Sequence, residues 1–154
     1  MEFKIYNLQT IERAVNERVE KMANEFSSTV EAEKDQIKIR TQSGIDVDGK
    51  QFVPYSNRIG PQGVWKDVRK ANNKQTAYVD LTFSGDMFKS MRAVFRRDGF
   101  KLLATIFFSD PLQAKKAKGH QTGLLGTIRF EPRKFFGLSK SQREAIVSKL
   151  RNVR

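Results

Sequence analysis

Apolar positions in the first 30 residues recur at steps of three or four, the spacing of one side of an α-helix. The opposite side is charged, and Asn7 or Thr10 is suited to cap the start of the helix. The repeat is also close to a heptad over about three heptads. Two arrangements therefore stay open: packing on a sheet of the same domain, which we favour, or a coiled coil with a partner. The apolar positions are Leu8, Ile11, Val15, Val19, Met22, Phe26 and Val30.

Period-two patterns follow in the middle of the chain. Residues 78–84 (YVDLTFS) alternate strictly, which predicts a strand with one buried face. Residues 36–40 (QIKIR) fit either a short strand or the tail of the first helix. Residues 93–98 and 100–109 surround Asp98-Gly99, a strong turn signal, and predict a β-hairpin. The second strand of this hairpin is the most apolar run of the chain, so we expect it at the centre of the sheet.

The remaining patterns predict shorter elements and a terminal helix. Residues 87–91 are expected to form a short helix, and residues 127–130 a last strand. Residues 112–126 are expected to be irregular, with one helical turn near the start. Ser139 begins a capping box that opens the terminal helix. The chain is therefore expected to be one α+β domain over residues 1–154, with a small antiparallel sheet of about four strands flanked by the N-terminal and C-terminal helices.

Residues 41–76 interrupt these regular patterns. Their glycines and prolines lie too close together for a stable helix. The same stretch holds large apolar side chains, which a disordered linker seldom carries. We therefore expect a long extended arm that becomes ordered against a partner. The candidate contacts in this arm are Phe52, Tyr55, Arg58 and Trp65.

The formal net charge is +12, and it is unevenly distributed. Residues 81–154 hold 16 basic and 5 acidic side chains, whereas residues 1–40 hold 7 basic and 8 acidic ones. Such a basic half predicts a positive surface that faces nucleic acid or an acidic protein. Candidate contacts for such a partner are Arg96, Arg97, Lys115, Lys116 and Lys118.

The sequence offers little for catalysis. Cysteine is absent, which excludes thiol catalysis, disulfides and cysteine-bound zinc, and neither a P-loop nor a nucleophile elbow is present. His120 is the single histidine and has no acidic neighbour in sequence, so we expect no catalytic or metal-binding role. Asp46 and Asp48 lack the other ligands of a calcium loop and are expected to form a turn with Gly49. We also expect no cofactor, no small-molecule substrate and no membrane span.

Residues 131–139 (EPRKFFGLS) place large apolar side chains between Pro132 and the terminal helix. Two roles stay open for Phe135 and Phe136. They pack the last helix onto the sheet, which we favour, or they form a docking point for a partner. Because Arg133 adjoins a proline, we expect it at the surface, where it would anchor a neighbouring subunit.

Four stretches in this order resemble one known family. They are RTQSGIDVDGKQFVPYS (residues 40–56), DLTFSGDMFKSM (80–91), KGHQTG (118–123) and EPRKFFGLS (131–139). They resemble the virion-morphogenesis family of tailed phages, the Mu-like tail-completion or neck proteins. The resemblance implies a structural protein and not an enzyme. It also implies that copies form a six-fold or twelve-fold ring, with His120 and Gln121 near a subunit contact.

The expected function is therefore that of a neck, head–tail joining or tail-completion subunit of a phage particle. It would lie in the virion, at the head–tail junction or tail end, and in the host cytoplasm during assembly. Its expected partners are further copies of itself and the portal, neck, tail-tube or tail-terminator proteins, with non-specific contact to genomic DNA. The alternative is a basic, non-enzymatic DNA-binding accessory protein, although helix-turn-helix, RRM and zinc-finger signatures are missing.

Overall fold

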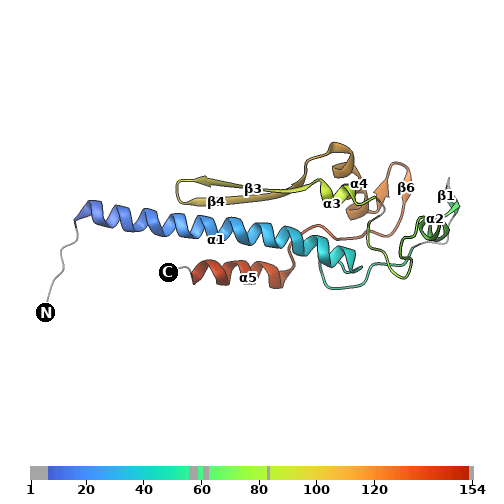
Figure 1. Ribbon diagram of the computed structural model, residues 1–154, viewed down its shortest axis with the longest axis horizontal. Helices are drawn as coiled ribbons and strands as arrows, with labels where there is room; N and C mark the ends of the chain where they lie inside the picture. Colours follow the sequence, from blue (N-terminus) through green and yellow to red (C-terminus); the bar gives the residue numbers. More distant parts are fainter. Residues whose placement is uncertain (1–6, 56–58, 61–62, 83, 153–154) are drawn as a thin grey trace.

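The computed structural model describes residues 7–55, 59–60, 63–82 and 84–152. The molecule is elongated, and its longest element is α1 (Leu8–Gln42). A hairpin of β3 (Met91–Asp98) and β4 (Lys101–Phe108) lies along one side of α1, and α5 (Lys140–Arg151) lies along another (Figure 1). The predicted α+β class, with a small antiparallel sheet, a long N-terminal helix and a C-terminal helix, is confirmed.

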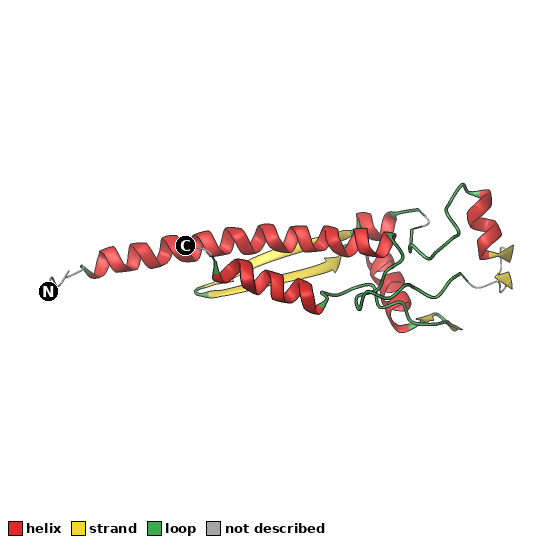
Figure 2. Ribbon diagram, turned by 90° about the horizontal axis from the view of Figure 1, so that it is seen from below, coloured by secondary structure: helices red, strands yellow, loops and turns green. Residues whose placement is uncertain are grey.

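The smaller elements gather at one end of the molecule (Figure 2). They comprise three helices and two short strand pairs. These are α2 (Trp65–Ala71), α3 (Asp86–Lys89), α4 (Pro111–Thr122), β1 (Ile59–Gly60), β2 (Gly63–Val64), β5 (Leu124–Leu125) and β6 (Ile128–Arg129). The prediction of a last strand within residues 127–130 is thus confirmed as β6.

The predicted four-stranded sheet is wrong. Among the described residues there are three separate two-stranded antiparallel sheets, β1-β2, β3-β4 and β5-β6. Residues 78–82 form no strand, and Phe83, which is also part of the predicted strand, lies outside the described residues. Val79 and Asp80 are both buried, although alternation would place them on opposite faces of a sheet. Leu81 also has a positive φ of 51°, which is incompatible with an extended strand. As a result, β4 has β3 as its single strand neighbour and is not central.

α1 is one continuous helix that includes residues 36–40. The side chain of Asn7 caps it by accepting a 2.7 Å hydrogen bond from the backbone N–H of Gln9. The helix packs on its own domain over its C-terminal part, where Ile37 is buried and the rings of Phe26 and Phe95 meet edge to face at 5.8 Å. The sequence left open packing on a sheet of the same domain or a coiled coil with a partner. The C-terminal part of α1 packs on the chain's own hairpin, and this arrangement holds for that part alone.

Two further helices correct the sequence-based expectations. α2 lies inside the stretch expected to be an extended arm, and α4 is regular where irregular structure was expected. Asp110 caps the start of α4, because its carboxylate accepts hydrogen bonds from the backbone N–H groups of Leu112 and Gln113. Gly119 lies inside α4 and does not end the helix. A Cβ at this position would come within 2.7 Å of the Leu125 side chain, so the glycine permits close packing here.

The main core lies where the C-terminal part of α1 meets α3, α4 and the segment before α5. Its buried members are Ile37, Phe52, Val79, Met87, Phe88, Met91, Ala117 and Phe135. The capping box predicted for α5 is confirmed, since Ser139 and Gln142 exchange hydrogen bonds between side chain and backbone. Within the described residues, no helix is both long and apolar enough to cross a membrane.

Candidate functional site

The four stretches that carry the family resemblance meet around Phe135, which has 0% exposure. From the first stretch, Arg40 donates a 2.8 Å hydrogen bond to the carbonyl oxygen of Phe135. The backbone N–H of Val47 donates one of the same length to the carbonyl of Lys134. From the second stretch, the ring of Phe88 meets Phe135 edge to face at 6.1 Å.

The third stretch joins the same centre through α4. The side-chain amide of Gln121 pairs with the backbone of Phe136: its Nε2 donates to the carbonyl at 3.2 Å, and its Oε1 accepts from the N–H at 3.1 Å. The backbone N–H of Arg133 donates to the carbonyl of His120 at 2.8 Å. Residues far apart in sequence therefore form one packed unit, which we call the Phe135 junction: residues 40–56, 80–91, 118–123 and 131–139, so far as they are described.

Arg133 is half-buried, so it is less exposed than its proline neighbour led us to expect. Its guanidinium lies 5.1 Å from the ring centre of Phe130, and its Nη1 lies 3.5 Å from Nδ1 of His120. Its Nε is buried and has no hydrogen-bond partner among the described residues. Burial lowers the pKa of Arg133.

His120 is held as a neutral imidazole. Burial, followed by the charges of Arg133 and Lys116, lowers the pKa of His120 to about 4. It lies in the last turn of α4, and its ring contacts Phe130 with centroids 5.6 Å apart. Within the described residues, no group of three or more His, Asp or Glu side chains has metal-binding geometry. The geometry assigns His120 a packing role beside Arg133.

A buried ionic cluster joins α2 to the loop that follows it. Arg69 and Asp80 form two hydrogen bonds of 2.9 and 3.0 Å. The hydroxyl of Tyr55 donates to Asp80 at 3.1 Å, and the guanidinium of Arg69 lies 4.7 Å from the centre of the Tyr55 ring. Arg69 was not predicted from the sequence, because its pairing with Asp80 leaves no local pattern.

The charges in this cluster support one another. Burial alone would raise the pKa of Asp80, but hydrogen bonds from Gln75 and Thr82 and the charge of Arg69 outweigh it, so the pKa is lowered. Burial first, and then the Asp80 charge, raises the pKa of Tyr55 to about 12. Tyr55 therefore stays neutral and acts as a hydrogen-bond donor to Asp80. Through this residue, the stretch expected to be an arm is anchored to the rest of the subunit.

The interface candidates fall into three groups. Phe52 and Phe135 lie in the core and have no surface to offer a second subunit. This corrects the interface prediction for Phe52, whereas for Phe135 it agrees with internal packing, the role favoured from the sequence. Phe136 is partly buried against Phe108, with ring centres 5.2 Å apart. Trp65 has 45% exposure at the start of α2, and Arg58 lies outside the described residues.

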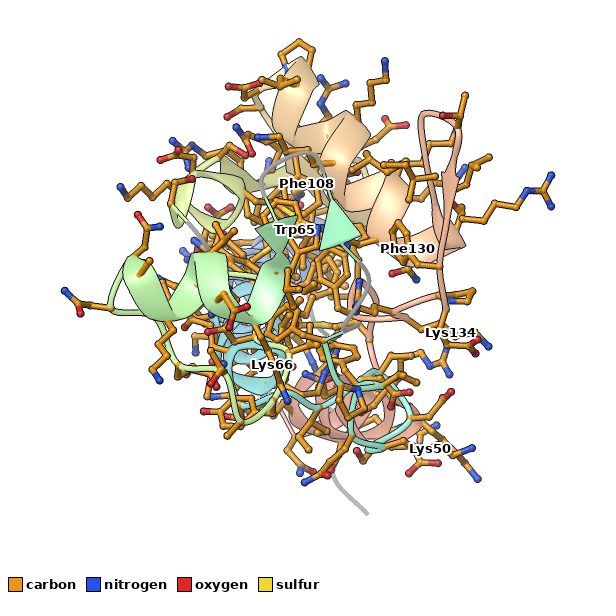
Figure 3. All side chains as sticks on the ribbon, turned by 90° about the vertical axis from the view of Figure 1, so that its right-hand side faces the viewer. Lys50, Trp65, Lys66, Phe108, Phe130 and Lys134 are labelled. Carbon is orange, nitrogen blue, oxygen red and sulfur yellow. The ribbon has the colours of Figure 1, made fainter. Side chains whose placement is uncertain are left out.

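The basic candidates do not form one patch. Arg97 pairs with Glu20 of α1 at 3.0 Å near the hairpin turn, and Arg96 is exposed on the outer hairpin face. Three exposed lysines lie on α4, at the other end of the hairpin: Lys115, Lys116 and Lys118. In the end-on view of Figure 3, Lys50 and Lys134 extend outward on one side.

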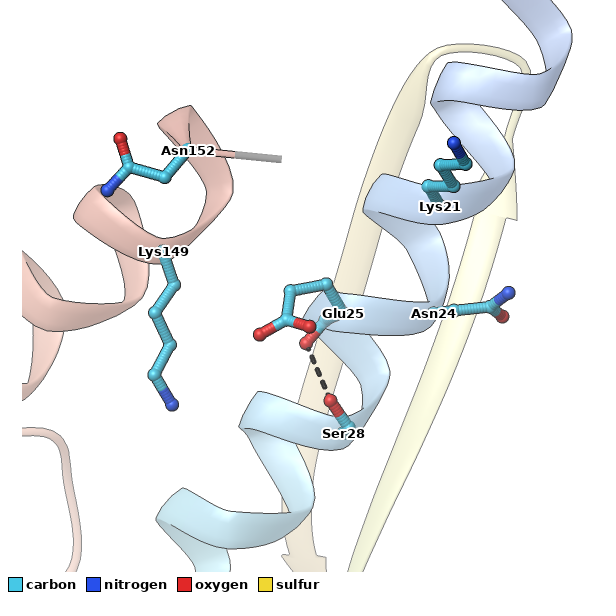
Figure 4. A pocket seen from close by; sticks show the side chains of 6 residues that line it. All are labelled: Lys21, Asn24, Glu25, Ser28, Lys149 and Asn152. Atoms are coloured by element: carbon cyan, nitrogen blue, oxygen red, sulfur yellow. Dashed lines mark hydrogen bonds between the residues drawn. The ribbon is translucent and has the colours of Figure 1, made fainter. Parts of the chain in front are cut away.

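A polar pocket lies between α1 and α5. Figure 4 shows the residues that line it: Lys21, Asn24, Glu25 and Ser28 on α1, and Lys149 and Asn152 at the C-terminal end of α5. The hydroxyl of Ser28 donates to the carbonyl of Glu25, as in many helices, and is not paired with a base. The lining contains no nucleophile beside a general base, so its chemistry supports no catalytic step.

The two acidic residues of the first stretch have the structural role expected for them. The Oδ1 atom of Asp46 accepts hydrogen bonds from the backbone N–H groups of Asp48 and Lys50. Gly49 has a φ of 81°, and Ile45 and Gln51 close the loop as an antiparallel bridge. The predicted turn is confirmed.

Comparison with known proteins finds no matching family model, no matching curated protein and no matching solved structure.

Proposed function

We propose that this protein is a structural subunit of a tailed-phage particle, in the neck, head–tail joining or tail-completion class, and that copies assemble into a ring. One observation carries the proposal. The four stretches that resemble the virion-morphogenesis proteins are far apart in sequence, yet they pack together in the Phe135 junction. Four chance similarities have no reason to meet at one place in space.

The rest of the molecule is consistent with an assembly role. The chain is elongated and leaves apolar side chains of α1 and the hairpin exposed, including Leu8, Ile11 and Leu103. Exposed apolar groups that recur along a surface are typical of protein–protein contacts. The basic surfaces suit acidic neighbouring proteins or DNA.

The experiment is deletion of the gene in the phage or prophage that encodes the chain, followed by electron microscopy of the lysate. We expect separate full heads and tails, or tails without a completed end, and rescue by the gene supplied from a plasmid. Intact infectious particles in the deletion strain would contradict the proposal. Neighbouring portal and tail genes would support it, whereas replication or repressor genes would favour the alternative.

The alternative is a basic DNA-binding accessory protein. The observation in its favour is the row of three exposed lysines on α4. These lysines lie apart from Arg96 and Arg97, however, and a DNA duplex is better bound by one continuous basic surface. We therefore rank this function second.

A further inference from the structure

Among the described residues, the buried or half-buried arginines are Arg40, Arg69 and Arg133. Arg69 binds both carboxylate oxygens of Asp80 and two backbone carbonyls. Arg40 donates hydrogen bonds to two backbone carbonyls and to a side-chain amide oxygen. Arg133 differs from both. Within the described part of the chain its side chain forms no ion pair, and its one hydrogen-bond contact is the 3.5 Å approach of Nη1 to Nδ1 of His120.

The backbone holds Arg133 in one place. Its N–H donates to the carbonyl of His120 at 2.8 Å, and its own carbonyl accepts from the N–H of Phe135 at 2.8 Å. The guanidinium lies 5.1 Å from the ring centre of Phe130, a ring that His120 also contacts. Such a guanidinium, fixed in position and short of acceptors, fits an acceptor from outside the subunit.

The surroundings of Arg133 specify an anionic acceptor. Residues 111–134 hold six basic side chains and one acidic side chain. Because the whole chain carries a net charge of +12, a second copy would bring mostly like charge to this surface. The acceptor therefore fits a different protein of acidic character better than a further copy.

The shape of the site favours a carboxylate over a DNA phosphate. A planar guanidinium matches a carboxylate through two parallel hydrogen bonds, and a single acidic side chain can reach a half-buried position. The phosphates of a duplex are met more readily by protruding side chains, such as the exposed lysines of α4.

We propose that Arg133 binds a carboxylate of an acidic partner protein, with Phe130 supporting the guanidinium and His120 beside it. The inference rests on the proposed function, because the partner is then a neighbouring protein of the particle. It adds the chemistry of that neighbour: an Asp or Glu side chain that completes the hydrogen bonding of Arg133.

NMR of the wild-type protein tests the site without any substitution. His120 is the one histidine of the chain, so its ring signals report on this position directly. The probe is an oligoaspartate peptide, whose carboxylates are ionised above about pH 4. In the free protein, burial and the charges of Arg133 and Lys116 lower the pKa of His120 to about 4. Peptide binding should raise this pKa towards 6.5, because a nearby carboxylate favours the protonated imidazole.

Two results of this titration would overturn the proposal. One is a pKa of His120 that stays unchanged at saturating peptide. The other is a DNA duplex that raises the pKa where the peptide does not, which would assign the site to nucleic acid.

Substitution separates a specific contact from general attraction between charges. Arg133→Gln should weaken peptide binding, measured by calorimetry, about 10-fold or more. Arg133→Lys keeps the charge but loses the planar pair of donors, so it should not restore the affinity. The matched control is Arg129→Gln, which removes the same charge from an exposed position on β6 and should change the affinity less than about 3-fold.

Equal losses in Arg129→Gln and Arg133→Gln would overturn the site, because attraction to the basic surface would then explain the binding. Thermal melting checks that each variant is folded. If deletion of the gene proves harmless to the phage while the peptide still raises the pKa of His120, the proposed function fails and the carboxylate site stands.

Discussion

The guanidinium of Arg69 binds the carboxylate of Asp80 through two hydrogen bonds, and both side chains are buried. The pair joins α2 to residues 75–82, and Arg69 also donates to the backbone carbonyls of Gln75 and Thr82. A stretch that reads as an arm in the sequence is therefore anchored within the subunit.

Replacement of Arg69 by Met should strongly destabilise the protein, because Asp80 would remain buried without its counter-charge. We expect the free energy of unfolding, measured with urea, to fall by about 3–5 kcal/mol. The double variant Arg69→Met with Asp80→Leu removes both charges and should recover part of this loss. A loss below about 1 kcal/mol in the single variant would show that solvent reaches Asp80.

Phe135→Ala separates packing from docking at the Phe135 junction. Because Phe135 is fully buried, we expect unfolding free energy to fall by about 3–5 kcal/mol. The control Val147→Ala, at an exposed position of α5, should change it by less than about 0.5 kcal/mol. A Phe135→Ala protein with unchanged stability that fails to enter particles would instead assign this ring to an interface.

Local patterns predicted the elements whose stabilising contacts are local. The Asn7 cap, the Ser139 capping box and the Asp98-Gly99 hairpin each depend on residues within a few positions, and all three are present. The errors have long-range causes. Residues 78–84 were predicted as a strand, but Asp80 pairs with Arg69 instead. Arg133 was expected at the surface, but it lies half-buried beside His120. Neither contact can be identified from spacing along the chain.

The residues of the candidate site were also predicted only in part. His120, Gln121, Arg133 and Phe136 were selected and do lie together, since they belong to stretches that meet at the Phe135 junction. Arg40 was not selected. It hydrogen-bonds the backbone carbonyls of Phe135 and Gly137 and the side chain of Gln142, contacts that only the folded chain brings together.

His120 should make stability depend on pH in a defined window. Its pKa is near 4 in the folded protein and near 6.5 when unfolded, so the unfolded chain binds more protons between these values. Stability from this residue is therefore fully present above pH 6.5 and is lost as the pH falls towards 4. The loss is at most about 3 kcal/mol.

The measurement is urea unfolding of the wild type and of His120→Gln at pH 7 and pH 4.5. Glutamine keeps a polar side chain and removes the titration, so the difference between the two proteins should shrink on acidification. Equal pH dependence in both would show that His120 titrates normally in the folded state.

The distribution of basic residues predicts how the protein binds DNA. With positive groups on several separate surfaces, we expect weak, sequence-independent binding that falls steeply with salt. Replacement of Lys115, Lys116 and Lys118 by Gln should reduce the slope of log K against log[salt] by at most about 2.7, the value for three released counterions. A control variant, Lys34→Gln, removes a lysine that already pairs with Glu31 on α1 and should change the slope little. Fluorescence anisotropy with two unrelated duplexes across a salt series provides both the slope and the selectivity. Tight binding to one duplex at physiological salt would contradict the structural role and favour a dedicated DNA-binding protein.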